Sequence, residues 1–576
     1  LRRIEELEAV ELDEIVVTGT LLRGSGDLAS PVIRLDRNAL DRSGHGTVAQ
    51  ALTSLPQNYA GSATPVVQTL NTDLGASNNV YATGVNLRGL GPASTLVLVN
   101  GRRLAGTGSR AEFADVSALP SAAVERVDVL LDGASALYGA DAIAGVVNVI
   151  MRRSFDGQET RVRASAAKGG AEDIIASHLA GTSWSSGSAY LSYEYQSSNA
   201  LSSYDRPYTA DGDLRPFGGS DRRSFYSGPG NIVAFDPAIS AYVTRFAIRP
   251  DASGTAQRPE DFVVGATNLQ SSNLGVDVLP KVERHSVYGR LSQSLGDRLE
   301  LTADVRYNHR SNDLATAANA GVFPVGRTNP FFISPTGAAT HTIAYSFLQD
   351  LGPARTHSES ESVGVTVGGR HDLTADWTLE AYVSGAEERA DFGAANRVNS
   401  RFLAEALGNI PDDPATPYSA AVDGYYNLFG DGGMNSRAVL DFVGSGYSEV
   451  HNRSRATSAN LLVQGPVLQL AGGDLDIALG AQVRDESFET QGLLSLSTAT
   501  PVRMATPKRE RSIAAIFAEA RIPFIGPDNA RPGLRSLELS LAGRYEEYSD
   551  FGSTTNPKIG LTWSPLEGLG LRASWG

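Results

Sequence analysis

The sequence predicts a transmembrane β-barrel preceded by a compact α+β domain. From about residue 158 onward, apolar and polar residues alternate with a period of two, the pattern of a strand with two different faces. The connections between these alternating runs are short and long in turn, as in outer-membrane barrels, which have short turns on one side and long loops on the other. No stretch approaches the roughly 18 uninterrupted apolar residues of a membrane-spanning helix, so we expect strands to make any crossing.

The alternating runs number about 13, and the clearest spans residues 299–308. Some runs reach about 17 residues, whereas strands of soluble proteins average about 5–6. A soluble β-sandwich or propeller array is therefore the weaker alternative. Aromatic residues fall near run ends, where a membrane barrel carries its interfacial girdles. These aromatics are Tyr193, Tyr195, Tyr307, Trp377, Tyr545, Trp563 and Trp575.

The chain divides into three predicted parts: an N-terminal extension with a flexible linker over 1–30, the α+β domain over 31–153, and barrel strands over 154–576. In the second part, apolar residues at helical spacing predict a helix over 47–55, with Thr47 as its cap and Pro56 ending it. Short β-rich runs surround this helix. The Asn100-Gly101 dipeptide is a strong signal for a tight turn between strands.

Composition excludes several classes of site. The 576 residues contain no cysteine, which rules out disulfide frameworks, thiolate metal sites and cysteine nucleophiles. The formal net charge of −15 argues against a nucleic-acid partner, since phosphate binding needs an excess of basic residues. The eight histidines lack metal-ligand spacing, and Gly89-Leu90-Gly91 lacks the third glycine of a dinucleotide-binding loop. We therefore expect no enzyme activity, no catalytic residue, no metal and no cofactor.

Several motifs resemble those of the TonB-dependent outer-membrane receptor family. Residues 13–19 resemble the TonB box, although their β-branched character equally allows an edge strand of the next domain. Four segments within 86–150 resemble the signature of the plug domain, and 548–561 is similar to the family's barrel. The predicted TonB-box residues are Asp13, Glu14, Ile15, Val16, Val17, Thr18 and Gly19. The plug-motif residues are Arg88, Gly89, Gly91, Asn100, Gly101, Arg102, Arg103, Glu125, Arg126, Gly139, Gly145 and Asn148.

The resemblance implies a 22-stranded barrel, filled by the plug, in the outer membrane of a Gram-negative bacterium. It implies a monomeric receptor, in contact with outer-membrane lipid, that imports a scarce nutrient with energy relayed by TonB and its inner-membrane energising complex. The nutrient would be an iron chelate (a siderophore complex), a cofactor or an oligosaccharide. The alternative is a plugged barrel used for signalling or adhesion without net import.

The sequence departs from the family pattern in two ways. Thirteen runs are an odd number, whereas single-chain bacterial barrels have an even number of strands. The last run also lacks the terminal aromatic strand that the family carries. Because residue 1 is Leu and the chain ends within an alternating run, we expect a fragment that is truncated at both ends.

Function in such a protein would lie in the TonB box and in loops. An extended box would pair with its partner by strand addition, through main-chain hydrogen bonds. Ligand recognition would fall to two plug loops, 59–81 and 106–113, and to the long outside loops 198–283, 311–356 and 391–447. Aromatic side chains there could stack on flat ligands, although most could equally pack the loops together. The candidate ligand residues are Tyr59, Tyr81, Tyr204, Tyr208, Phe217, Tyr425 and Tyr426.

Overall fold

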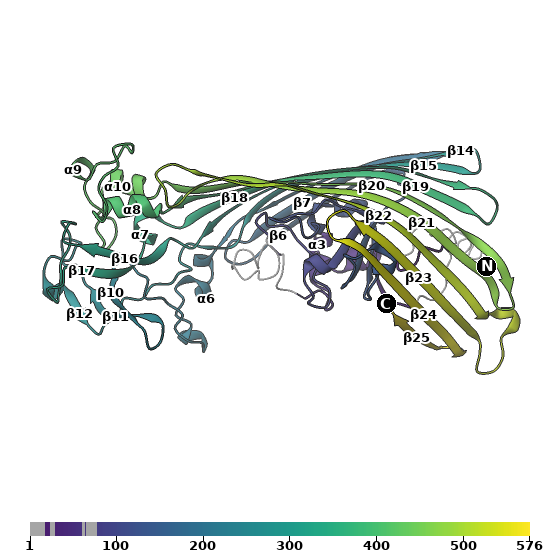
Figure 1. The fold of residues 1–576 in the computed structure, drawn as a ribbon, viewed down its shortest axis with the longest axis horizontal. Helices are drawn as coiled ribbons and strands as arrows, with labels where there is room; N and C mark the ends of the chain where they lie inside the picture. The colour runs from purple at the N-terminus through teal and green to yellow at the C-terminus, as the bar shows by residue number, and fades with distance from the viewer. Residues whose placement is uncertain (1–17, 24–28, 60–63, 65–77) are drawn as a thin grey trace.

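A computed structural model describes residues 18–23, 29–59, 64 and 78–576. The plug domain lies against the concave side of a large curved sheet, and a further folded unit lies beyond one end of that sheet (Figure 1). The chain therefore has the predicted plug-and-barrel fold. Among the helices in these ranges, none is long and apolar enough to span a membrane.

The large sheet contains 13 antiparallel strands in the described part of the chain, and their spatial order follows the sequence. The number and sequence positions of the alternating runs are thereby confirmed. The edge strands are β6 and β25. The strands are β6 (Gly157–Ala166), β7 (Glu172–Trp184), β8 (Gly187–Ser198), β14 (Lys281–Leu295), β15 (Leu299–Thr316), β18 (Ala354–Asp372), β19 (Thr378–Arg397), β20 (Gly446–Leu470), β21 (Gly473–Ser495), β22 (Val502–Ile525), β23 (Ser536–Tyr548), β24 (Gly552–Leu566) and β25 (Leu569–Trp575).

The two faces of this sheet differ as the alternation predicts. Leu301 and Val305 on β15 are exposed on the outer face, while Asn308 and Arg310 on the same strand are buried against the plug side. Several strands are longer than their alternating runs, and β15 continues to Thr316. Beyond the alternating run of β15, the main-chain hydrogen bonds continue but the outward residues become polar. Alternation of apolar and polar residues therefore no longer marks this end of the strand.

The plug is built on a five-stranded sheet with the order β1-β4-β5-β2-β3. Its elements are β1 (Val32–Asp36), α2 (Arg37–Arg42), α3 (Val48–Thr53), β2 (Thr95–Val99), β3 (Arg102–Arg103), β4 (Val124–Leu130), α5 (Ser135–Tyr138) and β5 (Gly145–Met151). Helix α3 confirms the predicted helix, and the Thr47 side chain accepts a hydrogen bond from the amide of Gln50 as its cap. Apolar residues of α3, β2, β4 and β5 form one buried core, which includes Leu52, Val97 and Val147.

The long connections, which the sequence presents as loops, contain a second folded unit. We call it the loop subdomain: a five-stranded sheet with four short helices around it. Its core holds Tyr345, Phe347, Tyr426 and Phe429. The elements are β10 (Asn231–Asp236), β11 (Ala241–Ile248), β12 (Phe262–Val264), β16 (Ala320–Gly326), β17 (Thr340–Ser346), α7 (Leu348–Leu351), α8 (Ser400–Ala406), α9 (Ala420–Asp423) and α10 (Arg437–Val443). Three smaller elements precede β14: β9 (Leu201–Ser202), α6 (Pro207–Ala210) and β13 (Asp277–Leu279).

The start of β5 provides a test of the plug core. Gly145 has a φ of +139°, and a Cβ there would lie 2.3 Å from the carbonyl oxygen of Leu130 on the paired strand. Such strain costs about 1–3 kcal/mol, so Gly145→Ala is expected to destabilise the plug. Hydrogen exchange of the β4 and β5 amides should then be at least about fivefold faster.

Gly133→Ala is the matched control, because a Cβ at Gly133 would meet nothing closer than 3.8 Å. Equal exchange rates in Gly145→Ala and the wild type would contradict the proposed close approach of β4 and β5.

Candidate functional site

The plug meets the barrel wall through buried polar contacts. Arg310 on the inner face of β15 is 3% exposed. It pairs with Asp115 of the plug and donates to the carbonyl oxygen of Val80 at 3.0 Å. Burial disfavours the charged form of Asp115, but the Arg310 guanidinium and hydrogen bonds from Ser117 and Thr83 outweigh it, so the pKa of Asp115 lies below its ordinary value. The carboxylate is thus held ionised at the interface.

Neighbouring wall strands repeat this arrangement. Glu194 on β8 and Arg284 on β14 pair at 2.6 Å, and both side chains are about 2% exposed. Glu194 also accepts the amide of Ser121 at 2.9 Å, while Arg284 donates to the carbonyl of Ser117. On β19, Glu388 accepts a hydrogen bond from Thr107. The inward charges of Glu194, Arg284 and Glu388 therefore find their partners on another wall strand or on the plug.

A second cluster holds the plug motif around Arg103. Its guanidinium bonds to Asp141 at 2.5 Å and to the carbonyl of Tyr138 at 2.8 Å. Arg103 is the main cause of the lowered pKa of Asp141, which also lies 3.7 Å from Arg484 of the wall. Gly139 has a φ of +101°, a conformation that favours glycine, and a Cβ there would lie 2.7 Å from Oε1 of Glu546. The signature glycine thus allows the wall to approach the plug closely.

Asn148 connects the extension to the plug sheet. Its buried side chain accepts the amide of Gly101 at 2.9 Å and donates to Oγ1 of Thr18 at 3.1 Å. Thr18 in turn donates to Asp128 at 2.9 Å, and Asn148 and Asp128 are opposite each other on β5 and β4. Residue 18 is therefore fixed on the plug sheet by two buried hydrogen bonds.

The remaining motif residues shape turns, contact the barrel wall or lie at the surface. Arg88, with a φ of +58°, donates to the carbonyls of Ile143 and Ala144, both at 3.0 Å. Asn100 bonds to the hydroxyl of Tyr288 on the wall at 3.2 Å. Arg102 lies over the ring of Tyr382 at 4.5 Å. Positive φ angles occur at four motif glycines, which are Gly89, Gly91, Gly101 and Gly145. Arg126 pairs with Asp128, and Glu125 is exposed.

Residues 18–23 continue from the plug onto the wall. Glu519 on β22 accepts hydrogen bonds from Oγ1 of Thr20 at 2.8 Å and from the amide of Leu21 at 2.5 Å. The backbone of Arg23 donates to Gln464 on β20 at 3.0 Å, and its guanidinium pairs with Glu380 on β19. The sequence prediction of a flexible linker did not anticipate these contacts. They come from wall residues more than 350 positions away, and the segment itself carries no periodic signal.

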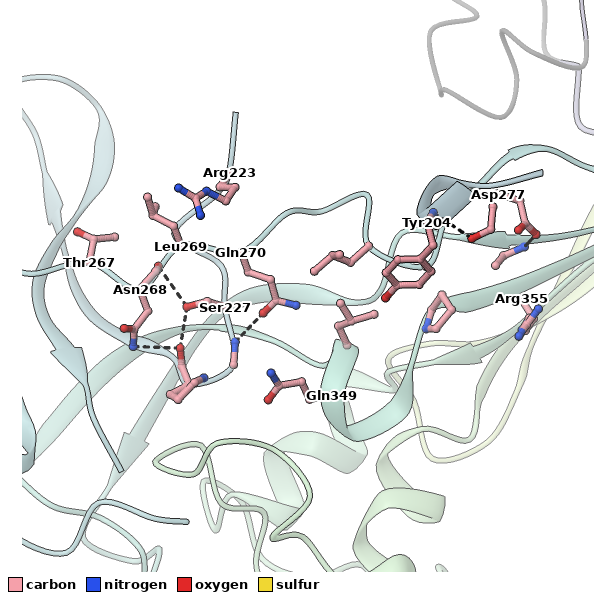
Figure 2. Close-up of a pocket in the computed structure, with 18 of the residues that line it drawn as sticks. Tyr204, Arg223, Ser227, Thr267, Asn268, Leu269, Gln270, Asp277, Gln349 and Arg355 are labelled. Atoms are coloured by element: carbon pink, nitrogen blue, oxygen red, sulfur yellow. Dashed lines mark hydrogen bonds between the residues drawn. The ribbon is translucent and has the colours of Figure 1, made fainter. Parts of the chain in front are cut away.

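A cavity of about 980 Å³ lies between the loop subdomain and the ends of β15 and β18 (Figure 2). Three arginines line it: Arg223, Arg249 and Arg355. Arg223 is paired with Asp221 at 2.8 Å and Asp213 at 3.2 Å. Asp277 is the carboxylate of the lining. Burial raises its pKa, while the amide of Ala315 and the charge of Arg355 oppose that shift. The lining is thus more basic than the chain as a whole.

The structure places the candidate ligand residues in different environments. Tyr204 lines the cavity and is 61% exposed, while Tyr208 and Phe217 are exposed in the same connection. Tyr59 packs against Gly89, and Tyr81 is buried, with its hydroxyl 3.4 Å from Thr356. Tyr425 lies beside Gly408 in the loop subdomain. Tyr426 is fully buried in the core of that subdomain. Within the described ranges, we find no group of three acidic, histidine or cysteine residues arranged to hold a metal ion.

Two family models match the chain. The TonB-dependent Receptor Plug Domain matches residues 26–146, and the TonB dependent receptor-like β-barrel matches residues 323–576. The chain belongs to the TonB-dependent receptor family. Among curated relatives, the vitamin B12 transporter BtuB of Photobacterium profundum is 27% identical over 189 residues, covering 32% of this chain and 28% of the relative. The ferric enterobactin receptor PirA of Pseudomonas aeruginosa is 39% identical over 80 residues, covering 12% and 11%.

Solved TonB-dependent receptors share the fold. The ferric enterobactin receptor PfeA of Pseudomonas aeruginosa aligns with a TM-score of 0.52 at 15% identity, covering 95% of this chain and 62% of that structure. The siderophore receptor PirA of Acinetobacter baumannii aligns with the same TM-score at 13% identity, covering 94% and 60%. The chain thus spans about three-fifths of these receptors and a smaller part of the curated relatives. These relatives are named as receptors and transporters, none as an enzyme.

The predicted TonB box of this receptor lies across the border of the described residues. Asp13, Glu14, Ile15, Val16 and Val17 lie outside them. Thr18 is buried on the plug sheet, and the amide of Gly19 donates to the Tyr138 hydroxyl at 3.2 Å. A pull on residues 13–17 would therefore act first on Thr18 and Gly19, and next on the wall contacts of residues 20–23.

We expect Glu519→Gln to loosen residues 18–23. Hydrogen bonds to a charged group contribute about 1.5–3 kcal/mol. Loss of the Glu519 charge should therefore raise the equilibrium constant for local opening of residues 18–23 roughly tenfold or more. Leu22 is 3% exposed and the chain has no cysteine, so the thiol introduced by Leu22→Cys reports this opening through its labelling rate with a thiol reagent.

Glu510→Gln is the matched control, because Glu510 lies on the same strand but is exposed. An unchanged labelling rate in the Glu519→Gln background would show that Glu519 does not hold the segment.

Proposed function

We propose that this chain is the plug and part of the barrel of an outer-membrane receptor that binds a scarce extracellular nutrient and imports it with energy relayed by TonB. The observation that carries the proposal is the continuous path from the predicted TonB box, through Thr18, into the plug sheet that fills the concave face of the barrel wall. Family membership supports the outer membrane of a Gram-negative bacterium as its location and TonB as its partner.

The ligand class follows from the arginine-lined cavity. Arg249 and Arg355 add positive charge to a lining whose carboxylate is Asp277, and guanidinium groups bind carboxylates and other oxyanions in bidentate fashion. Tyr204 adds a flat apolar surface beside them. An anionic metal chelate or an acidic cofactor fits this lining better than a neutral oligosaccharide. The relative named for ferric enterobactin supports a metal chelate, and the relative named for vitamin B12 supports a cofactor.

The TonB box is tested by Val16→Pro. Proline removes a main-chain donor and restricts the strand, so pairing by strand addition should fail. We expect uptake of the ligand by intact cells to be abolished while binding at the cell surface persists.

Val16→Ile is the control, since it retains the β-branched character that strands favour and should support normal uptake. Normal uptake by the Val16→Pro variant would contradict the assignment of residues 13–19 as the TonB box.

The cavity is tested by the double variant Arg249→Gln with Arg355→Gln. Each charge-assisted hydrogen bond contributes about 1.5–3 kcal/mol, so the Kd of an anionic ferric chelate for the receptor should rise at least about tenfold. Titration of ferric chelates of different charge against whole cells measures this change.

Arg437→Gln is the control, because Arg437 is an exposed arginine on α10 outside the cavity lining. Equal Kd values for anionic chelates in the double variant and the wild type would show that the cavity is not the ligand site. That result would not contradict TonB-dependent import.

A further inference from the structure

One buried carboxylate in the arginine-lined cavity is only partly satisfied. Asp277 at the start of β13 is 8% exposed, and its Oδ2 accepts the amide of Ala315, near the end of β15, at 2.6 Å. Within the described ranges, its Oδ1 has no hydrogen-bond donor and its charge has no ion-pair partner. Buried charges are normally paired and hydrogen-bonded, so the position of Asp277 in the cavity needs an explanation.

Two arginines of the same cavity also lack partners. In the part of the chain that the structure describes, the guanidinium groups of Arg249 and Arg355 form no hydrogen bond and no ion pair. Arg223 differs from them, because two aspartates already pair with it. An anion in the cavity would therefore meet two available positive charges and one negative charge, that of Asp277.

Asp277 lies where it can oppose an anion that binds to Arg355. Both residues lie with Tyr204 at one end of the cavity, whereas Arg223 lies at the other end (Figure 2). Two charged groups act on Asp277 from the elements around β13. They are Arg355 at the start of β18 and Asp205 in the short helix η4 (Ser203–Asp205). The local charge at this end of the cavity therefore depends on whether Asp277 is ionised.

The protonation of Asp277 is shifted toward neutral pH. Burial raises the pKa of Asp277, the amide of Ala315 and the charge of Arg355 oppose that shift without cancelling it, and Asp205 adds to it. The carboxyl group therefore takes up its proton at a higher pH than an ordinary aspartate. Below that pH it is neutral, so it no longer repels an anion, and its hydroxyl can donate a hydrogen bond. The affinity of the cavity for an anion should accordingly rise as the pH falls.

We propose that Asp277 sets the charge selectivity of the cavity: when ionised it disfavours anionic ligands, and when protonated it admits them. The receptor then binds an anionic ligand more tightly in mildly acidic surroundings than near neutral pH, while a neutral ligand binds equally well to both forms. This inference rests on the proposed function, since it assumes that the cavity holds the imported ligand.

The test measures binding of a fluorescent naphthalene disulfonate to the full-length receptor in lipid nanodiscs. The two sulfonates of this probe stay ionised throughout, so only the receptor titrates between about pH 7.5 and about pH 5. The wild-type Kd should fall at least about threefold over this range. Asp277→Asn should bind at least about fivefold more tightly than the wild type at the higher pH, the repulsion of two unit charges about 4 Å apart in water. Its Kd should no longer depend on pH.

A gain in affinity separates the predicted effect from misfolding, which would weaken binding. Asp441→Asn is the matched control, because Asp441 is exposed on α10 outside the cavity lining, and it should keep the wild-type Kd and pH dependence. Binding of the neutral naphthalene disulfonamide should be the same in Asp277→Asn and the wild type.

Two outcomes would overturn the inference at different levels. If Asp277→Asn matches the wild type at both pH values while Arg249→Gln with Arg355→Gln weakens probe binding, Asp277 does not select by charge, and the cavity remains the ligand site. If the double arginine variant binds the probe as tightly as the wild type, the cavity is not an anion site, and the proposed ligand site fails together with this inference.

Discussion

The polar inner face of the barrel sheet is the constraint on which the rest of the structure depends. Strands that expose Leu301 and Val305 on the outer face must present their alternate residues inward, and those residues include charges that are nearly completely buried. A buried charge without a partner costs several kcal/mol. The plug supplies the partners: Asp115 for Arg310, the amide of Ser121 for Glu194, and Thr107 for Glu388. The plug therefore supplies the ion-pair and hydrogen-bond partners that the buried charges of the wall need.

This interface also explains why the plug signature is rich in Gly, Asn and Arg. Gly139 permits Glu546 to approach the plug backbone, Asn148 joins Thr18 to the plug sheet, and Arg103 ties α5 to Asp141 beside the wall. Such contacts are individually polar and directional, unlike a continuous apolar core. Force applied at Thr18 would break them a few at a time, whereas each wall strand is held by a full ladder of main-chain bonds to its neighbours.

Much of the fold could be predicted from the sequence, because period-two alternation reports directly on a sheet with two different environments. The alternation predicted the 13 strands, and the Thr47 cap and Pro56 predicted helix α3. The loop subdomain could not be predicted in this way, since its helices have four to seven residues and show no long periodicity. The pairing of Arg310 with Asp115 joins residues 195 positions apart, and the contacts of Glu519 with Thr20 and Leu21 span about 500. No local pattern encodes such pairings. The aromatic residues of the loops gave a composition signal only, which did not distinguish exposed Tyr204 from Tyr426 in the core.

The central claim is that the plug is held in the wall by separate polar contacts and yields to a pull from its N-terminal side before the wall does. Single-molecule force measurements on the receptor in a lipid bilayer, with the load applied at residue 1, test it most directly. The account predicts that the plug sheet unfolds in several steps at low force, while the strands from β6 to β25 stay in the membrane. Extraction of barrel strands before or together with the plug would contradict it.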